Sequence, residues 1–384
     1  MRRLRLPVTP TGWVVLVVGA GALTVGWQRG WVEVATAGAV LLVLFLVSLV
    51  FAVGRSSYAV TLELVDTRVR IGQRALGRIE VVSTARRRLL PARVELPVGA
   101  GSATFALPWM VPGAVHEDVF SIPTTHRGVI PVGPVRSVRG DPLGLLRRRV
   151  RWTDAIELYV HPEVVALTGA SAGVLRDLEG QSTRELSNND MSFHALRVYV
   201  AGDDRRNIHW KTTARTGQLM VRQYEDTRRT HTALALATCT EDFSDDAEFE
   251  LAVSVAASIG VGTVRDERGL TACAGESVLR SSSSVLLLDD CSGLVMGDDQ
   301  PRVADLAAIC ARRAPDASAV IVVLGSVVPE ADVLAAVRVL HGVRTVVVGC
   351  SIGAPLSVRT RRGVSFVTLG DLADLPQALL AVGS

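Results

Sequence analysis

The sequence predicts a membrane protein with three consecutive parts: two transmembrane helices, an all-β sandwich of immunoglobulin-like type, and an α/β domain with a doubly wound sheet. Two uncharged apolar runs near the N-terminus predict the helices. Short alternating segments rich in valine and isoleucine predict the sandwich. Near-continuous apolar strands that alternate with helical patterns predict the α/β domain. With 384 residues, the chain is long enough for each soluble part to bury its own core.

Residues 1–57 form a predicted transmembrane hairpin. One uncharged run extends from Trp13 to Trp27 and a second from Ala35 to Val53, which is about the length that a helix needs to cross a bilayer. Residues 28–33 alone connect the two runs, so the helices must be antiparallel. Arginines precede the first run and follow the second, at positions 2, 3, 5 and 55. The positive-inside rule therefore predicts a multi-pass protein of the plasma membrane whose termini and bulk are cytoplasmic.

The alternative for this region is a signal peptide that is cleaved after Ala35–Ala37. Cleavage there would leave the second run as a single anchor and place the cysteines outside the cell. The five cysteines are widely spaced, form no C-x-x-C pair and have mostly apolar neighbours. They support neither a zinc site nor a redox motif and fit a reducing cytoplasm.

Residues 58–162 show the alternation of an antiparallel sandwich. Glycine, proline and arginine-rich turns separate the expected strands, which cover residues 58–65, 76–82, 92–98, 117–123 and 156–162. The histidines at 116, 126 and 161 are isolated, so we interpret them as structural or surface residues.

Residues 230–384 have the pattern of a parallel sheet covered by helices on both faces. The expected strands cover residues 231–237, 318–325 and 344–350, and the expected helices begin at Phe249, Val303, Glu330 and Leu372. No glycine-rich phosphate loop follows any of these strands, so we predict no nucleotide cofactor. A net charge of +3 is nearly balanced, which argues against nucleic-acid binding.

Residues 163–229 contain a linker and a dense polar stretch, "YVAGDDRRNIHW", at positions 199–210. We predict a helix over residues 205–216 that Asp203 or Asp204 caps and Gly217 ends, followed by a strand from Gln218. In this interpretation the stretch is a structural lock, in which Trp210 is buried and nearby arginines pair with the two aspartates. The alternative is catalysis by Asp203, Asp204 and His209. No nucleophile, metal-ligand set or second base accompanies them at a recognisable spacing, so we assign no catalytic residue.

At these residues the chain resembles the domain-of-unknown-function-58 family. The family pattern is a tyrosine, Gly-Asp-x-x-Arg, Ile-x-Trp and Ala-Arg. It matches Tyr199, Gly202, Asp203, Arg206, Ile208, Trp210, Ala214 and Arg215, with Asp204 inside the pattern. The segments "HRG" at 126–128 and "DPLGL" at 141–145 extend the resemblance over most of the chain. It implies a membrane protein without established enzymatic activity, whose C-terminal part resembles a degenerate von Willebrand factor A domain.

Two further implications come from the resemblance. Relatives commonly accompany MoxR-type AAA+ ATPases and transglutaminase-like membrane proteins, which are therefore the expected partners. A metal-binding A domain carries Asp-x-Ser-x-Ser after its first core strand, whereas this chain has Ala237 or Thr238 where the first aspartate is expected. We therefore predict no metal or other cofactor.

Two functional classes follow from these observations. The first is a membrane-anchored, non-enzymatic scaffold or adaptor that works with the ATPase in envelope-related assembly. Its candidate partner surface lies at the carboxyl ends of the parallel strands, at Thr238, Glu241, Asp242 and Glu330. The second is a hydrolase that uses the Asp, Arg and His residues of the signature. The missing nucleophile favours the adaptor.

Overall fold

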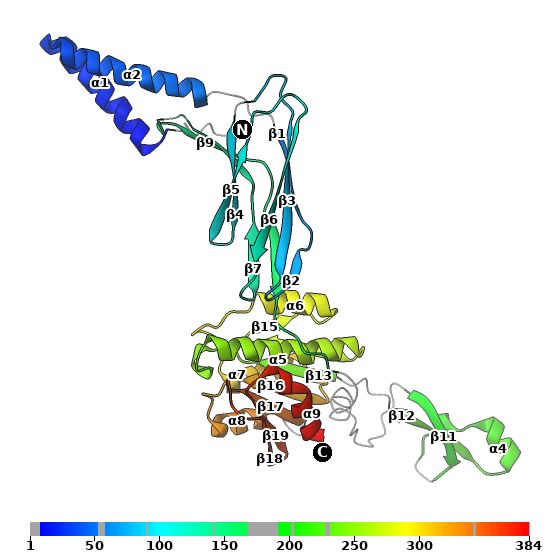
Figure 1. The fold of residues 1–384 in the computed structure, drawn as a ribbon. Coiled ribbons are helices and arrows are strands. Elements are labelled where there is room, and N and C mark those ends of the chain that lie inside the picture. The colour runs from blue at the N-terminus through cyan, green and yellow to red at the C-terminus, as the bar shows by residue number, and fades with distance from the viewer. Residues whose placement is uncertain are drawn as a thin grey trace. The chain divides into compact units, whose positions relative to one another are not determined.

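The computed structural model describes residues 8–52, 58–89, 91–140, 143–167, 191–200, 203–226, 231–340 and 343–383. The chain divides into two compact units, Met1–His161 and Pro162–Ser384 (Figure 1). The arginines at positions 2, 3, 5 and 55 lie outside the described residues, as do Asp141 and Pro142 of the "DPLGL" segment.

Two apolar helices begin the first unit, α1 (Pro10–Arg29) and α2 (Val32–Ala52). Both are long and apolar enough to cross a membrane, with mean hydropathies of 1.4 and 2.4, which supports association of the chain with a membrane. The connection is shorter than the expected residues 28–33, because both helices extend into it and leave only Gly30 and Trp31. Gly30 ends α1 with φ +69, a left-handed conformation that glycine adopts without strain.

Small residues allow the two helices to pack closely. A Cβ atom on Gly26 would lie 2.5 Å from the backbone nitrogen of Ala35, and one on Gly38 would lie 2.5 Å from that of Leu23. Such close backbone approach is typical of helices that associate within a membrane.

The described residues of the first unit also form ten strands: β1 (Tyr58–Leu64), β2 (Arg68–Arg70), β3 (Arg74–Ser83), β4 (Ala92–Val98), β5 (Gly101–Leu107), β6 (Val115–Pro123), β7 (Gly128–Val132), β8 (Arg136–Gly140), β9 (Arg147–Arg151) and β10 (Ile156–His161). They form a sheet of order β1-β3-β6 and a larger one of order β2-β10-β7-β4-β8-β9, with β5 added to β4. Ile79 from the smaller sheet and Leu96 and Leu158 from the larger one belong to one core. All five expected strand segments are strands.

The second unit is built on a sheet of β13 (His231–Leu236), β14 (Gly269–Ala274), β15 (Ser277–Leu279), β16 (Ala319–Leu324), β17 (Arg344–Cys350), β18 (Ser357–Arg361) and β19 (Val364–Leu369). The order is β15-β14-β13-β16-β17-β19-β18. The five central strands are parallel, whereas β15 and β18 pair antiparallel at the edges. The sheet is therefore mixed: the predicted strands β13, β16 and β17 form its centre, and the parallel strands β14 and β19 and the antiparallel edge strands extend it on both sides.

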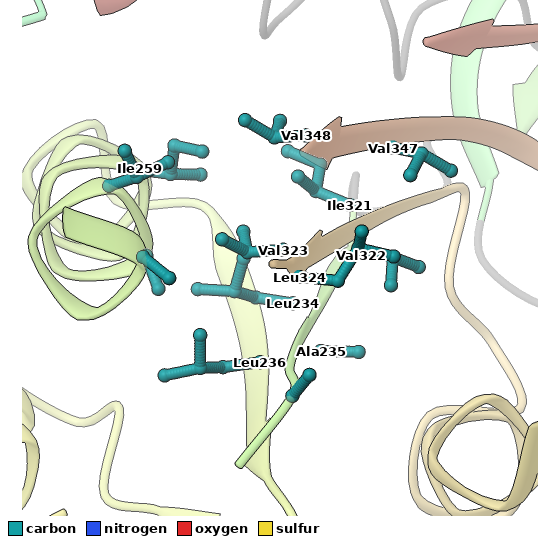
Figure 2. Close-up of a cluster of buried hydrophobic side chains, with 14 of the residues drawn as sticks. Leu234, Ala235, Leu236, Ile259, Ile321, Val322, Val323, Leu324, Val347 and Val348 are labelled. Atoms are coloured by element: carbon teal, nitrogen blue, oxygen red, sulfur yellow. The ribbon is translucent and has the colours of Figure 1, made fainter. Parts of the chain in front are cut away.

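Helices cover both faces of this sheet: α5 (Asp246–Arg265), α6 (Ser284–Ser292), α7 (Val303–Arg313), α8 (Glu330–Val337) and α9 (Leu375–Gly383). Figure 2 shows Leu236, Val323 and Val348 extending toward Ile259 of α5, while Val322 and Val347 extend to the opposite side. This alternation buries both faces of the strands, as their continuous apolar sequences predict. The helix α5 is also long and apolar enough to cross a membrane, but 72% of it is buried in this core.

A separate hairpin precedes the sheet, formed by β11 (Met191–Val198) and β12 (Met220–Asp226). Between them lie a 3-10 turn, η1 (Arg205–Asn207), and the short helix α4 (Trp210–Thr216). The single helix expected over residues 205–216 was wrong. Ile208 is extended and bridges to Val221 of β12, which interrupts the helix.

Shortening Ile321, which is 1% exposed, tests the importance of this core. We expect Ile321→Ala to lower the free energy of unfolding of the second unit by about 2–5 kcal/mol, because it leaves a cavity. Val327→Ala, at a position that is 51% exposed, should change it by no more than about 0.5 kcal/mol. Hydrogen-exchange protection of β13 and β16 during urea titration of the purified chain measures both. Equal losses would contradict the assignment of Ile321 to the core.

Candidate functional site

An ion pair holds the turn that follows β11. The two guanidinium nitrogens of Arg197 donate to the two carboxylate oxygens of Asp203 at 2.6 and 2.7 Å. The backbone N–H of Val200 donates to the same carboxylate at 2.9 Å. These bonds favour the ionised form, so they lower the pKa of Asp203, with the Arg197 bond as the largest cause. The expected pairing of an arginine with Asp203 is present, but the arginine is Arg197 and not Arg205 or Arg206.

Asp204 and His209 form local caps. The carboxylate of Asp204 accepts from the backbone N–H of Arg206 at 2.9 Å and caps η1. His209 Nδ1 accepts from the backbone N–H of Thr212 at 3.2 Å and lies 2.8 Å from the Thr212 hydroxyl, at the N-cap of α4. Asp203, Asp204 and His209, the catalytic alternative, therefore each hold the local backbone.

Other signature residues shape the same hairpin. Ile208 and Val221 are 7% and 4% exposed and form its small interior. Tyr199 donates its backbone N–H to Leu219 O at 2.8 Å. Gly217 ends α4 with φ +71, as predicted. Gly202 lies outside the described residues.

The expectation that Trp210 is buried was wrong. Its side chain is 67% exposed. Because the helix starts only at Trp210, Ile208 occupies the inward position opposite Val221, and the tryptophan points away from this interior. Arg206 is exposed as well, so the lock does not depend on contacts of these two side chains.

The exposed tryptophan stands among cationic residues. We call this group the Trp210 surface; it consists of Trp210, Arg205, Arg206, Lys211 and Arg215, all exposed. Ala214 is exposed beside it. Val198, the last residue of β11, and Val200 are also 52% and 62% exposed. A tryptophan and arginines are the side chains that most often carry binding energy at protein interfaces.

The carboxyl ends of β13 and β16 form a second polar region. Thr238 is 2% exposed, and its hydroxyl donates to the side-chain oxygen of Gln300 at 3.2 Å. Asp242, in the 3-10 turn η2 (Thr240–Asp242), is 3% exposed. The expectation that Thr238 and Asp242 belong to a partner surface was therefore wrong, because the connections after β13 fold over the strand ends.

Glu241 and Glu330 are the accessible members of this predicted surface. Glu241 lies 2.5 Å from Arg302, and both side chains are mostly exposed. Glu330 lies 2.5 Å from Arg361, with its side chain 39% exposed. Exposed pairs of this kind contribute little to stability, at most about 1 kcal/mol. Both glutamates thus remain available to an external cation.

Asp242 is a buried carboxyl group whose Oδ2 has no hydrogen-bond partner among the described residues. Burial raises the pKa of Asp242, since a low-dielectric environment disfavours the charged form, and nearby Arg302 only partly opposes this effect. The loop after β16 approaches closely: a Cβ atom on Gly325 would lie 2.2 Å from Asp242 O.

Glu248 is a buried acid that the sequence analysis missed. It is 0% exposed in the first turn of α5. Its carboxylate accepts from the backbone N–H of Ser244 at 3.0 Å, from the Ser244 hydroxyl and from the backbone N–H of Ser326 after β16. The Asp245-x-x-Glu248 spacing is a capping-box signal that sequence reasoning could have used. The contact with Ser326 has no local signal.

The acids at the strand ends do not assemble into a metal centre within the described ranges. No group of three or more His, Cys, Asp or Glu side chains there is placed to hold a metal ion. Glu248 is satisfied by main-chain and hydroxyl donors, and Asp242 faces the interior. Chemically, this region offers the carboxylates of Glu241 and Glu330, each paired with an arginine.

Comparison with known families supports the resemblance at the signature. Residues 195–281 match the family described as "Protein of unknown function DUF58". This match includes the Trp210 surface and continues into the α/β sheet. No curated protein matched the chain.

Several solved structures are weakly similar. The CARDB domain of the PF1109 protein from Pyrococcus furiosus shares 11% identity over 27% of this chain and 87% of its own, with a TM-score of 0.21. The C-terminal domain of wzt shares 13% over 29% and 77%, with a TM-score of 0.23. Alkylpurine DNA glycosylase AlkC from Pseudomonas fluorescens shares 14% over 39% and 44%, also with a TM-score of 0.23. Scores this low carry no argument about fold or function.

The two aspartates of the signature should respond differently to the same change. Asp203→Asn removes the charge-assisted pair with Arg197, so hydrogen exchange of residues 196–222 should accelerate at neutral pH. Because the folded pKa of Asp203 is lowered, the parent should lose this protection as the pH falls below the unfolded value of 3.8 and through the folded pKa. Asp204→Asn is the matched control, since asparagine caps as well as aspartate. Equal acceleration in both variants would contradict the lock.

Asp242 should make stability depend on pH in the opposite sense. Its folded pKa is raised, so the unfolded chain releases the proton first and stability falls as the pH rises from 3.8 through the folded value. Asp242→Asn should therefore melt above the parent at neutral pH, with a difference that shrinks toward about pH 4. Melting curves across this range measure it, with exposed Asp299→Asn as control. A difference that does not change with pH would contradict the buried carboxylate.

Proposed function

We propose that this chain is a membrane-associated scaffold that recruits a protein partner through the Trp210 surface and does not itself catalyse a reaction. One observation carries the proposal. The acidic and histidine side chains of the signature are engaged in caps and an ion pair, whereas Trp210 and its basic neighbours face outward. The signature thus presents a rigid binding surface and leaves no free acid–base pair among the three residues weighed for catalysis.

The proposed partner is a MoxR-type AAA+ ATPase, with a transglutaminase-like membrane protein as a second component of envelope-related assembly. This choice follows from the family resemblance, which the match at residues 195–281 supports. The chemistry of the Trp210 surface requires an acidic patch with an apolar pocket on the partner. Complementary charge would speed association and select the partner.

The Arg197–Asp203 pair supports this role because it orders the turn before binding. A surface that is already ordered loses little conformational entropy when the partner binds. The apolar area of Trp210 that is exposed to water in the free chain is buried in the complex, where the ring enters a pocket.

The proposed architecture places this surface on the cytoplasmic side of the plasma membrane. In it, α1 and α2 cross the membrane with both termini inside, the β-rich part is an immunoglobulin-like sandwich, and the α/β part is a degenerate von Willebrand factor A-like domain. The shared core of the two sheets and the parallel centre of the second sheet support these assignments. Anchoring raises the effective concentration of the scaffold for partners at the membrane.

We also propose a second partner contact at the strand ends, limited to the exposed Glu241 and the partly exposed Glu330. Their arginine partners, Arg302 and Arg361, are themselves exposed, so a basic partner could replace them. The contact at the strand ends would add to the affinity that the Trp210 surface provides.

Capture of the ATPase by the full chain from detergent-solubilised membranes tests the proposal. Trp210→Ala should weaken binding at least about 30-fold, the cost of losing an interface hot spot of 2 kcal/mol. Trp109→Ala is a matched control, because Trp109 lies in the first unit and is 66% exposed. Glu241→Lys tests the strand-end contact separately.

Two results would overturn the scaffold. One is normal capture by both Trp210→Ala and Glu241→Lys. The other is hydrolysis of a substrate by the parent chain that Asp203→Asn abolishes while its ATPase capture persists, which would establish the hydrolase alternative.

A further inference from the structure

The turn between β8 and β9 packs against the ends of the two apolar helices. Thr9, the N-cap of α1, donates its backbone N–H to Leu145 O at 3.0 Å, and its hydroxyl lies 2.8 Å from Gly144 O. A Cβ atom on Gly12 would lie 2.1 Å from Leu145 O. The turn residues Leu145 and Leu146 form an apolar cluster with Val8, Val15, Phe45 and Leu49. Strand β9 therefore begins beside the first turns of α1 and the last turns of α2.

Strand register collects arginines on one face of the sheet that follows this turn. In β9, residues 147, 149 and 151 share a face because side chains alternate along a strand. Arg151 lies opposite Arg136 of β8, which lies opposite Glu95 of β4. Arg149 lies opposite Val138, which lies opposite Arg93. We call Arg93, Arg136, Arg147, Arg149 and Arg151 the arginine face.

The carboxylate of Glu95 lies between two arginines of this face. Glu95 accepts from Arg147 at 2.7 Å and lies 3.7 Å from Arg149. Arg151 pairs with Asp154 in the next turn at 2.6 Å. Arg136 and Arg151 remain directly opposite each other, and like charges in that position destabilise an antiparallel pair. The side chains of Arg147 and Arg149 are 48% and 53% exposed, so an external anion can reach them.

We propose that the arginine face binds the phosphate groups of anionic lipids in the leaflet where α1 begins and α2 ends. Guanidinium groups bind phosphate through paired hydrogen bonds. The contacts of the β8–β9 turn hold this face next to the helix ends, where lipid headgroups lie. Leu143 is 55% exposed on the turn and provides an apolar side chain at the same place. The inference rests on the membrane association in the proposed function and is independent of the ATPase.

A cleft beside the arginine face adds room for a lipid. The edge strands β1 and β9 border this open cleft of about 580 Å³, whose lining includes Val60, Leu62, Arg151 and Trp152. Trp152 is held by a 2.8 Å hydrogen bond from its indole nitrogen to the Ser137 hydroxyl. The cleft also contains Asp154, which pairs with Arg151, so a lipid phosphate at Arg151 would replace Asp154 while Val60, Leu62 and Trp152 contact the glycerol region.

Thermal stabilisation of the full chain in a neutral detergent tests the proposal. The parent is titrated with short-chain phosphatidylglycerol, with the matched phosphatidylcholine and with inorganic phosphate, because a ligand that binds only the native state raises the melting temperature. Phosphatidylglycerol should stabilise most. The double variant Arg147→Gln, Arg149→Gln should bind it roughly 25-fold more weakly, about fivefold for each arginine removed.

Two further variants keep the test independent of folding defects. The double variant Arg70→Gln, Arg74→Gln removes the same amount of charge near the start of β3. This end of β3 is the one away from the helices, because its other end, at Ser83, pairs with Tyr58, which follows the helices in the chain. This control should keep the affinity of the parent. Glu95→Gln removes the carboxylate that competes for Arg147 and Arg149, so it should raise the affinity for phosphatidylglycerol.

Three results would overturn the proposal. Stabilisation of the parent by phosphatidylcholine or inorganic phosphate that equals stabilisation by phosphatidylglycerol would show that the face is not a site for anionic lipids. Equal losses in the β9 variant and in the Arg70/Arg74 control would show a general charge effect. Weaker binding by Glu95→Gln would show that the carboxylate helps rather than competes. The double variant Arg147→Gln, Arg149→Gln should still capture the ATPase. This measurement distinguishes a failure of the lipid proposal from a failure of the scaffold proposal.

Discussion

The bidentate pair between Arg197 and Asp203 is the interaction on which the signature depends. It joins the end of β11 to the turn before η1, and the same carboxylate accepts from the Val200 amide. With the turn held, Asp204 caps η1, Ile208 bridges to β12 and α4 begins at Trp210. A hairpin with only two strands has little apolar area to bury, so an ion pair and caps replace a core as its source of order. The exposed tryptophan is the consequence.

The two buried acids of the α/β unit show how differently a protein can treat a carboxylate. Glu248 receives donors from its own helix N-terminus and from the loop after β16, which compensate for the loss of water. Asp242 has a raised pKa and an oxygen without a hydrogen-bond partner among the residues that the structure describes. Glu248 therefore joins α5 to the strand ends, whereas the buried Asp242 lowers the free energy of unfolding at neutral pH.

Both proposed surfaces of this chain are cationic, yet they are built for different ligands. The Trp210 surface combines basic side chains with a large exposed ring on an ordered turn, which suits a protein partner. The arginine face lies on a sheet, two of its arginines share Glu95, and it starts beside the first turns of α1 and the last turns of α2, which suits phosphate groups at a membrane. The net charge of +3 does not reveal these two cationic surfaces, because acidic residues elsewhere in the chain balance their charge.

Local patterns in the sequence determined the apolar helices, the five expected strands of the first unit, the strands β13, β16 and β17, and the glycine that ends α4. Each follows from periodicity or from a backbone preference that a few neighbouring residues carry. The strands β14, β15, β18 and β19 of the same sheet were not predicted. Of these, β15 and β18 are short and partly exposed, so they leave a weak pattern. Tertiary structure alone decided that Arg197 pairs with Asp203, that Trp210 faces water and that Thr238 and Asp242 are covered. It also brought Arg136, Arg149 and Glu95 together, because strand register joins residues that are distant in the chain, and no local signal encodes that pairing.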